Sequence, residues 1–342
     1  MKRIRIGIIG SGFMAKTHAV SFTKYLDSAE LVGFAGGSRA PALAQEFDVK
    51  AFAEPADLLS SDEVDAVVIT TPHAQHLDQA LPVAKAGMHL LLEKPMATTL
   101  DQCRQIIQAF ADRDKVLMIA YTQRFRTANR MARDIIASGE IGQVTMISEW
   151  GLVAGGLDNY PTWQRQPENL GILFGYGCHN LDKLRWFLES EPVSVTGLTR
   201  LSHSGVETTA MGTYAFQNGA MAQIWTGVDL PRPGFERSAY RSRVVGTEGL
   251  LDVDGYGALR VCPGGSDWET RFVQPAIDWQ GEGAFSDTRM GSFNTQNQEF
   301  LDAIHENRPA TVSGQDGMAS VHMALGLYQA AATNTVYHFD TN

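Results

Sequence analysis

The sequence MKRIRIGIIGSGFMAK (residues 1–16) decides the fold of the first part of the chain. Basic residues followed by an apolar run are typical of a signal peptide, but Arg5 interrupts this run and Lys16 closes it. Residues 4–9 instead have the isoleucine-rich composition of a short β-strand, and residues 13 to about 26 predict a helix. We therefore expect a strand, a glycine turn and a helix.

The turn between this strand and this helix has the pattern G-x-G-x-x-A, formed by Gly10, Gly12 and Ala15. The first glycine permits a tight turn, the second lets a ligand approach the backbone, and the small alanine lets the helix pack closely on the strand. The N–H groups at the start of the helix can bind phosphate. The pattern predicts a dinucleotide site that includes Gly10, Gly12, Phe13 and Met14.

Strand and helix signals alternate through the first third of the chain. The strands are almost continuously apolar, which is typical of strands that are buried on both faces of a parallel sheet. We expect residues 1–123 to form an α/β domain with a doubly wound parallel sheet of the Rossmann type. The predicted strands are 4–9, 31–35, 66–70, 89–92 and 116–121, and the predicted helices are 13–26, 40–47, 57–59, 76–86 and 100–112.

The pattern changes after about residue 123. Turns such as Asn218-Gly219 and Asp254-Gly255 are typical of hairpins, so the strands here should pair mainly antiparallel. We expect residues 124–342 to form an α+β domain with a large open sheet. Its predicted strands are 144–153, 194–201, 208–216, 220–226, 241–246, 250–253 and 259–261, and its predicted helices are 127–138, 177–188, 292–306 and 314–333.

Composition excludes several classes of protein. The chain has 342 residues and a formal net charge of −10, so it lacks the basic excess with which nucleic-acid-binding proteins displace counterions. No stretch has the roughly 18 consecutive apolar residues of a membrane span. Three dispersed cysteines (Cys103, Cys178 and Cys262) indicate reduced thiols and a cytoplasmic location. The nine histidines show no zinc-site spacing, so we expect no metal.

The end of the second predicted strand bears on the choice of dinucleotide. An acidic residue at this point would bind both ribose hydroxyls and repel a 2′-phosphate. Here the chain reads Phe34-Ala35-Gly36-Gly37-Ser38-Arg39, which offers a hydroxyl at Ser38 and a cation at Arg39. This composition favours NADP(H), while NAD(H) with Arg39 stacked on the adenine or in solvent stays open.

Several segments in order along the chain resemble the Gfo/Idh/MocA (glucose–fructose oxidoreductase, inositol dehydrogenase and rhizopine catabolism) family. They are the glycine turn, Thr71-Pro72, Glu93-Lys94-Pro95, and Gly177-x-His179-x-x-Asp182. The resemblance implies an NAD(P)-dependent oxidoreductase that acts on a sugar, a cyclitol or a related polyol. It also implies a homodimer or homotetramer that assembles through the C-terminal sheet.

Lys94 is a candidate catalytic residue on independent grounds, because it follows a parallel strand at the edge where doubly wound sheets bind ligands. Its ammonium group can orient a substrate hydroxyl and stabilise the alkoxide that forms as hydride leaves. A surface lysine paired with Glu93 is the alternative interpretation. By resemblance, His179 is the proton donor or acceptor. The expected cofactor contacts are Gly10, Gly12, Phe13, Met14, Ser38, Arg39, Thr71, Pro72, His76, Glu93 and Lys94.

Three positions depart from the family pattern. Gly175 stands where members commonly carry an aspartate four residues before the histidine, which would orient the imidazole. Tyr176 or a water can replace that group, His179 can act alone, or the reaction can differ. Leu170 replaces a loop glycine and His73 replaces an asparagine; these two changes reshape the pocket.

Substrate contacts are expected from position, because aromatic rings stack on sugar rings and arginines bind carboxylates and hydroxyls. Packing between domains is the alternative for each. Two other functions stay open: cleavage of a glycosidic bond with no net redox change, and a regulatory protein that binds the cofactor without turnover. The expected substrate contacts are Tyr121, Arg124, Trp163, Arg165 and Asp182.

Overall fold

The computed structural model describes residues 2–111, 114–235, 240–279 and 281–340. The chain forms two compact units, one of Met1–Thr122 with Asp278–Met318 and one of Gln123–Ile277 with Ala319–Asn342. We had expected all residues after 123 to lie in the second domain. Asp278–Met318 departs from this expectation because its long helix packs on the first unit.

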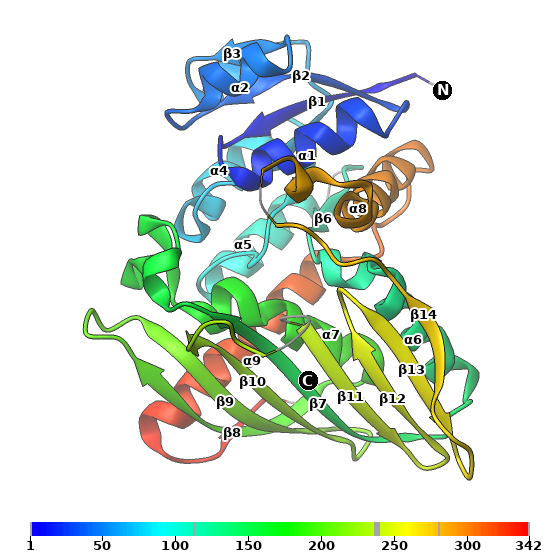
Figure 1. The fold of residues 1–342 in the computed structure, drawn as a ribbon. Coiled ribbons are helices and arrows are strands. Elements are labelled where there is room, and N and C mark those ends of the chain that lie inside the picture. The colour runs from blue at the N-terminus through cyan, green and yellow to red at the C-terminus, as the bar shows by residue number, and fades with distance from the viewer. Residues whose placement is uncertain (1, 112–113, 236–239, 280, 341–342) are drawn as a thin grey trace. The chain divides into compact units, whose positions relative to one another are not determined.

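The first unit contains a six-stranded sheet in the order β3-β2-β1-β4-β5-β6, with every pair parallel (Figure 1). This confirms the predicted doubly wound sheet. The central strand β4 is buried at every residue, as its apolar sequence requires when helices cover both faces. The strand β3 was not predicted. The bounds are β1 (Ile4–Ile9), β2 (Ala29–Ala35), β3 (Lys50–Phe52), β4 (Ala66–Ile69), β5 (His89–Leu92) and β6 (Leu117–Ile119).

Helix α8 (Asp287–His305) packs against α1 (Phe13–Lys24), and the two lie side by side in Figure 1. A buried hydrogen bond of 3.1 Å joins His18 of α1 to Asn297 of α8. Such contacts explain why this late segment belongs to the first unit. The other helices of this unit are α2 (Ala40–Glu46), α3 (Pro55–Ser60), α4 (His76–Lys85) and α5 (Leu100–Ala111), and α9 (Gly314–Thr333) begins in it.

The second unit contains a nine-stranded sheet in the order β14-β13-β12-β11-β7-β10-β9-β8-β15. Only β10 and β7 pair in parallel, so the predicted antiparallel character is confirmed. The strands β14 and β15 were not predicted. The bounds are β7 (Val144–Ala154), β8 (Pro192–Leu201), β9 (Glu207–Phe216), β10 (Met221–Leu230), β11 (Tyr240–Gly246), β12 (Gly249–Asp254), β13 (Ala258–Pro263), β14 (Glu269–Val273) and β15 (Tyr337–His338).

Helices α6 (Thr127–Ser138), α7 (Cys178–Leu188) and α9 pack on this sheet. Leu327 of α9 fills the space beside Gly197 and Gly212, which leaves no room there for a β-carbon. Because side chains alternate along a strand, the residues next to these glycines point to the opposite face. Leu198 and Met211 are paired neighbours there and are 68% and 41% exposed.

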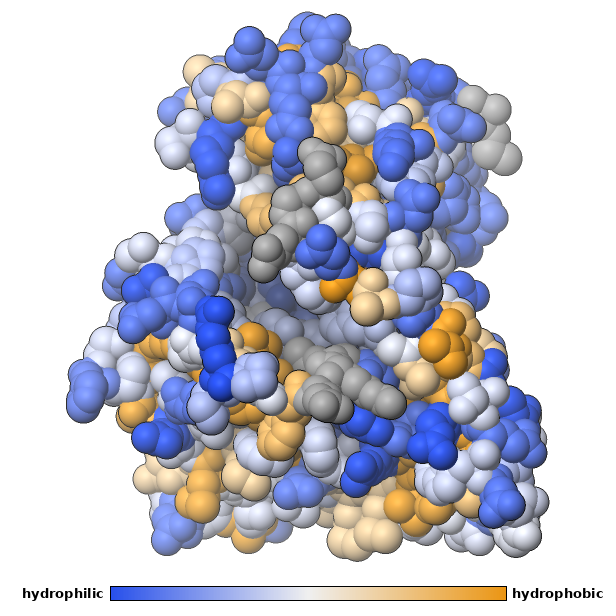
Figure 2. Space-filling view, viewed as in Figure 1, coloured by the Kyte–Doolittle hydropathy of each residue, from blue (hydrophilic) through white to orange (hydrophobic). Residues whose placement is uncertain are grey.

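The face of the molecule in Figure 2 is mainly hydrophilic, with smaller hydrophobic patches between the polar side chains. Across the described ranges, no helix combines the length and the apolar character that a membrane span needs. No disulfide joins the three cysteines, all of which lie in described segments.

Candidate functional site

The glycine turn lies at the carboxyl edge of the parallel sheet, between β1 and α1. Gly10 has a φ of +115°, and a β-carbon there would lie 2.4 Å from the hydroxyl oxygen of Thr70, so no other residue fits. Gly12 is the N-cap of α1; no described side chain caps this helix, and its first turn contains no acidic residue. The N–H groups of the first turn are therefore available to an anion.

The segment after β2 packs against this turn. A β-carbon on Gly37 would lie 2.3 Å from the Ser11 hydroxyl, and the same hydroxyl accepts a 3.3 Å hydrogen bond from the Arg39 N–H. The Arg39 guanidinium lies 3.7 Å from the position of a β-carbon on Gly12. Ser38 is exposed beside it. The structure thus brings the predicted cation and the glycine turn together.

Lys94 and Glu93 lie at the end of β5, two strands from β1 in the same sheet. The Glu93 carboxylate is buried, and it contacts the His18 ring at 3.1 Å and accepts a 3.1 Å bond from the Lys94 N–H. Glu93 therefore fixes the backbone of Lys94, whose side chain is only partly buried. The peptide bond between Lys94 and Pro95 is cis.

His76 connects the segments that follow β4 and β5 at the carboxyl edge of the parallel sheet. Its ring nitrogens lie 3.0 Å from the Thr71 carbonyl oxygen and 2.9 Å from that of Pro95. The side chain is fully buried, and burial lowers the pKa of His76. Both nitrogens thus face backbone carbonyl oxygens, which agrees with a structural role for His76, the alternative to the expected cofactor contact. The Thr71 hydroxyl is bound by Gln79 at 2.6 Å.

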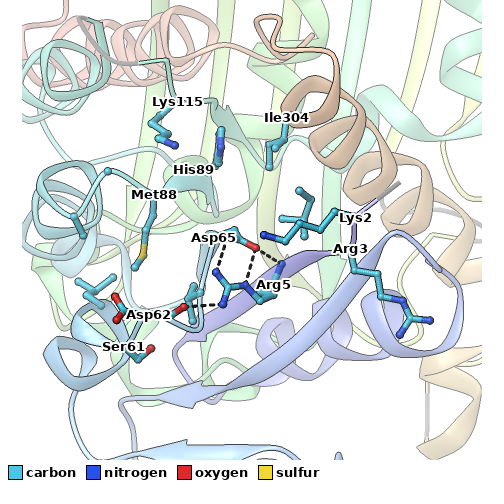
Figure 3. A pocket seen from close by; sticks show the side chains of 15 residues that line it. Lys2, Arg3, Arg5, Ser61, Asp62, Asp65, Met88, His89, Lys115 and Ile304 are labelled. Carbon is cyan, nitrogen blue, oxygen red and sulfur yellow. Dashed lines mark hydrogen bonds and ion pairs between the residues drawn. The ribbon is translucent and has the colours of Figure 1, made fainter.

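The opposite edge of the same sheet contains a different cavity, of about 420 Å³, at the start of β1 (Figure 3). Arg5 lies in it with its guanidinium bound to both carboxylate oxygens of Asp65. Burial and the nearby Lys115 lower the pKa of His89 to about 4, so this histidine is neutral at physiological pH. The predicted cofactor-binding residues lie at the other edge of the sheet.

In the second unit, His179 is the second residue of α7 and is 6% exposed. A π-helical turn, Leu173–Gly177, precedes it; such turns are frequent at functional sites. The His179 ring packs edge-on against Tyr240 at 5.7 Å, and the Tyr176 ring stacks on Tyr240 at 4.7 Å. Aromatic rings thus flank His179. The aspartate that would orient this histidine in the family is replaced by Gly175 in this chain.

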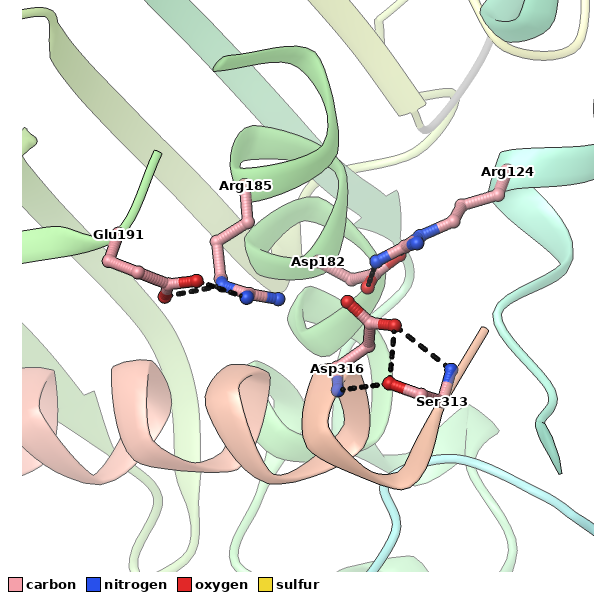
Figure 4. Close-up of polar contacts among 6 residues, drawn as sticks. All are labelled: Arg124, Asp182, Arg185, Glu191, Ser313 and Asp316. Atoms are coloured by element: carbon pink, nitrogen blue, oxygen red, sulfur yellow. Dashed lines mark hydrogen bonds and ion pairs between the residues drawn. The ribbon is translucent and has the colours of Figure 1, made fainter. Parts of the chain in front are cut away.

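Two of the expected substrate contacts, Arg124 and Asp182, bind each other in the structure. The Arg124 guanidinium forms two hydrogen bonds of 2.8 and 2.6 Å with the fully buried Asp182 carboxylate (Figure 4). Each group neutralises the other, so this pair ties the segment after β6 to α7. Figure 4 also shows the pairing of Arg185 with Glu191 in this unit.

Two more expected contacts, Tyr121 and Arg165, also have neighbours within the chain. Tyr121 is fully buried. Arg165 donates to the carbonyl oxygens of Tyr160 and Asp158 at 2.9 and 2.8 Å, which folds its own loop. Trp163 is half-buried in this loop and stays a predicted contact.

Glu207, a buried carboxylate next to the π-helical turn, was not predicted from the sequence. It accepts hydrogen bonds from the Leu173 N–H at 2.8 Å and from the Tyr328 hydroxyl at 2.9 Å. Leu170, which replaces a family glycine, has a φ of +64° just before this turn, a conformation that favours glycine. Glu207 begins the strand β9, in which polar and apolar residues alternate. The sequence around Glu207 therefore does not indicate that its carboxylate is buried and bound by the π-helical turn.

Burial raises the pKa of Glu207 to about 7 from the ordinary 4.5. Between these values the folded chain keeps a proton that the unfolded chain releases, so stability should fall as pH rises from about 4.5 to 7. The penalty above pH 7 amounts to roughly 3 kcal/mol. We expect Glu207→Gln to remove this decline in urea titrations at pH 5 and pH 8. The exposed Glu248→Gln should keep the decline in stability between pH 5 and pH 8. The same decline in Glu207→Gln would contradict the raised pKa of Glu207.

Together, the parallel sheet, the uncapped glycine turn and the lysine at the same edge define a nucleotide-binding oxidoreductase fold. Residues 4–121 match the model described as "Oxidoreductase family, NAD-binding Rossmann fold", and residues 129–252 match the GFO/IDH/MocA C-terminal domain. The chain belongs to the Gfo/Idh/MocA family, which confirms the resemblance seen in the sequence.

Similar proteins span the whole chain. A 1,5-anhydro-D-fructose reductase of Ensifer adhaerens is 28% identical over 98% of this chain and 99% of its own length. An inositol 2-dehydrogenase of Saccharopolyspora erythraea is 24% identical over 97% and 94%. The structure of levoglucosan dehydrogenase with NADH and levoglucosan superposes with a TM-score of 0.86 at 20% identity, covering 99% and 100% of the two chains.

Proposed function

We propose that this chain transfers a hydride between a nicotinamide dinucleotide and a hydroxyl or carbonyl carbon of a sugar, cyclitol or related polyol. The observation that carries the proposal is the position of Lys94 at the same sheet edge as the uncapped glycine turn. The relatives support it, because their names describe a reductase of an anhydro sugar and dehydrogenases of inositol.

The first unit fits the dinucleotide. The turn at Gly10 and Gly12 would hold the pyrophosphate on the N–H groups of α1. Phe13 and Met14 follow in this first turn, and Thr71-Pro72 lies just after β4, the strand next to β1. The Arg39 guanidinium beside Gly12 suits a 2′-phosphate, so the proposed cofactor is NADP(H), with NAD(H) as the less favoured choice. When bound, the nicotinamide supplies the site that accepts or donates hydride.

The chain's own residues supply the proton chemistry in this proposal. The Lys94 ammonium binds the reacting oxygen of the substrate, orients it and stabilises negative charge on it. His179 takes the hydroxyl proton during oxidation and returns it during reduction. The Glu93 carboxylate accepts a hydrogen bond from the Lys94 N–H, which fixes the backbone from which the lysine side chain extends.

The cofactor assignment predicts tighter binding of NADPH than of NADH. We expect at least a tenfold difference in Kd, about 1.4 kcal/mol, in titrations that follow nicotinamide fluorescence. Arg39→Gln should abolish the difference by weakening NADPH alone, because only NADPH carries the 2′-phosphate. Arg104→Gln, an exposed arginine on α5, should keep it. Equal or tighter binding of NADH by the wild type would contradict NADP(H), and binding of neither would contradict the proposed function.

We also propose that the face of the nine-stranded sheet opposite α9 joins copies of this chain into a dimer or tetramer. Leu198 and Met211 give this face exposed apolar side chains, which soluble proteins usually cover. Light scattering after gel filtration should give a mass of two or four chains, and Leu198→Glu should shift it toward one chain. A monomeric wild type would contradict this assembly.

A further inference from the structure

The second unit contains a buried arginine, Arg126, which the proposed mechanism does not use. Arg126 is the N-cap of α6 and is only 3% exposed. Its guanidinium carbon lies 3.8 Å from the centre of the Tyr256 ring. Its Nε atom is buried, and no hydrogen-bond partner for it exists among the described residues. The sequence analysis did not single out this residue.

Arg126 differs from the other arginines around it. Arg124 is bound by the Asp182 carboxylate and Arg241 by the Asp252 carboxylate. In the described part of the chain, no carboxylate forms an ion pair with Arg126, and the groups that act on its charge most strongly are tyrosine hydroxyls. A buried guanidinium without an anion is costly, because water solvates a charge far better than a protein interior does.

Burial accordingly lowers the pKa of Arg126, and the opposing groups are the phenols of Tyr256, Tyr240 and Tyr176. A cation–π contact with Tyr256 compensates only part of the lost hydration. Tyr256 and Tyr176 are themselves only partly buried, so the cluster extends to the surface of the unit. A small anion that entered beside these tyrosines would supply the missing charge.

The tyrosine cluster also connects Arg126 to the candidate catalytic histidine. The ring of Tyr256 lies 5.8 Å from that of Tyr240, and the ring of Tyr240 lies 5.7 Å from that of His179. All these residues belong to the same unit. Arg126 and the histidine therefore belong to one connected cluster of side chains.

We propose that Arg126 binds a carboxylate of the substrate, and that the substrate class is acidic sugars such as uronates. The proposal rests on the proposed function for the reaction itself. A guanidinium binds a carboxylate through two parallel hydrogen bonds, which suits the donor that lacks a partner here. The partly buried ring of Tyr176 provides an apolar surface for the sugar carbons.

The test compares three hexuronates (D-glucuronate, D-galacturonate and D-mannuronate) with their parent hexoses. Calorimetric titrations at constant ionic strength use the full chain, with and without saturating NADPH. We expect at least one uronate to bind ten times more tightly than its parent hexose. Arg126→Gln should lower affinity for that uronate about thirtyfold and leave affinity for the hexose within threefold.

Arg130→Gln is the matched control, because Arg130 lies one turn further along α6 and is exposed; it should keep the uronate preference. Arg126→Lys should retain part of it, since the charge remains without the paired donors. Absence of any uronate preference in the wild type would overturn the proposal even if Arg126→Gln does not fold. Survival of the preference in Arg126→Gln would also overturn it. Because binding is measured without turnover, a failure to transfer hydride would count against the proposed function alone.

Discussion

Lys94→Met should lower kcat/KM by about three orders of magnitude, whichever sugar or cyclitol the wild type turns over best. The variant keeps the length of the side chain but removes the ammonium group that binds the reacting oxygen. Positioned proton donors and charge-stabilising groups each contribute roughly 10²–10⁴-fold to enzyme rates. The loss should appear in kcat, because the charge on oxygen develops only as hydride moves.

Measurements on the same variant separate catalysis from folding and cofactor binding. The Kd for NADPH should stay within about threefold of the wild type. Lys85→Met, which removes an exposed lysine on α4, should leave kcat unchanged. A Lys94→Met variant with turnover within tenfold of the wild type would show that Lys94 is a surface residue.

The same experiment extends to His179. If Lys94 and His179 act in one step, the double variant Lys94→Met/His179→Ala should lose about as much as the more damaging single variant. Additive losses would indicate separate roles. A regulatory protein would bind NADPH without turning over a substrate, so neither substitution could lower a rate. The comparison therefore also tests this alternative.

The first unit could be predicted almost completely from the sequence, because each of its signals is local. The apolar strand β1, the glycine turn and α1 follow one another within 21 residues, from Ile4 to Lys24. The strand β3 was missed because only three residues form it, and two of them are exposed. Helix α8 could be predicted, but its contact with α1 could not, because the contact joins residues that lie far apart in the sequence.

The site could be predicted less well, because position in a motif does not tell which partner a polar side chain takes. Arg124 and Asp182 were expected to contact the substrate, yet they bind each other. Arg126, two residues from Arg124, was not selected, although it is buried and no carboxylate of the described residues forms an ion pair with it. Burial and charge pairing decide these roles, and both depend on contacts between α6, α7 and the strands of the second sheet.

A buried ion pair under α7 illustrates the same dependence on distant contacts. The Lys183 ammonium lies 3.1 Å from the Glu149 carboxylate of β7, and both side chains are fully buried. Asn180 donates a 2.9 Å hydrogen bond to the same carboxylate oxygen. Burial raises the pKa of Glu149, while the charge of Lys183 opposes this shift. The pair therefore fixes α7, the helix that carries His179, on the sheet.

Lys183→Met should lower the free energy of unfolding of the second unit by about 3–5 kcal/mol, because it leaves the Glu149 carboxyl buried without its partner. Replacing both residues, as Lys183→Met/Glu149→Leu, should recover most of this loss. Urea titrations that follow tryptophan fluorescence suit the test, since five of the six tryptophans lie within residues 123–277.

The matched control is Arg185→Met, which removes a cation from the same helix. Its partner Glu191 is 51% exposed and can be hydrated when the pair is broken, so the loss should stay within about 1 kcal/mol. Equal losses in Lys183→Met and Arg185→Met would mean that burial does not set the strength of the Lys183–Glu149 pair. A double variant no more stable than Lys183→Met would show that packing around the lysine, rather than its charge, holds α7 in place.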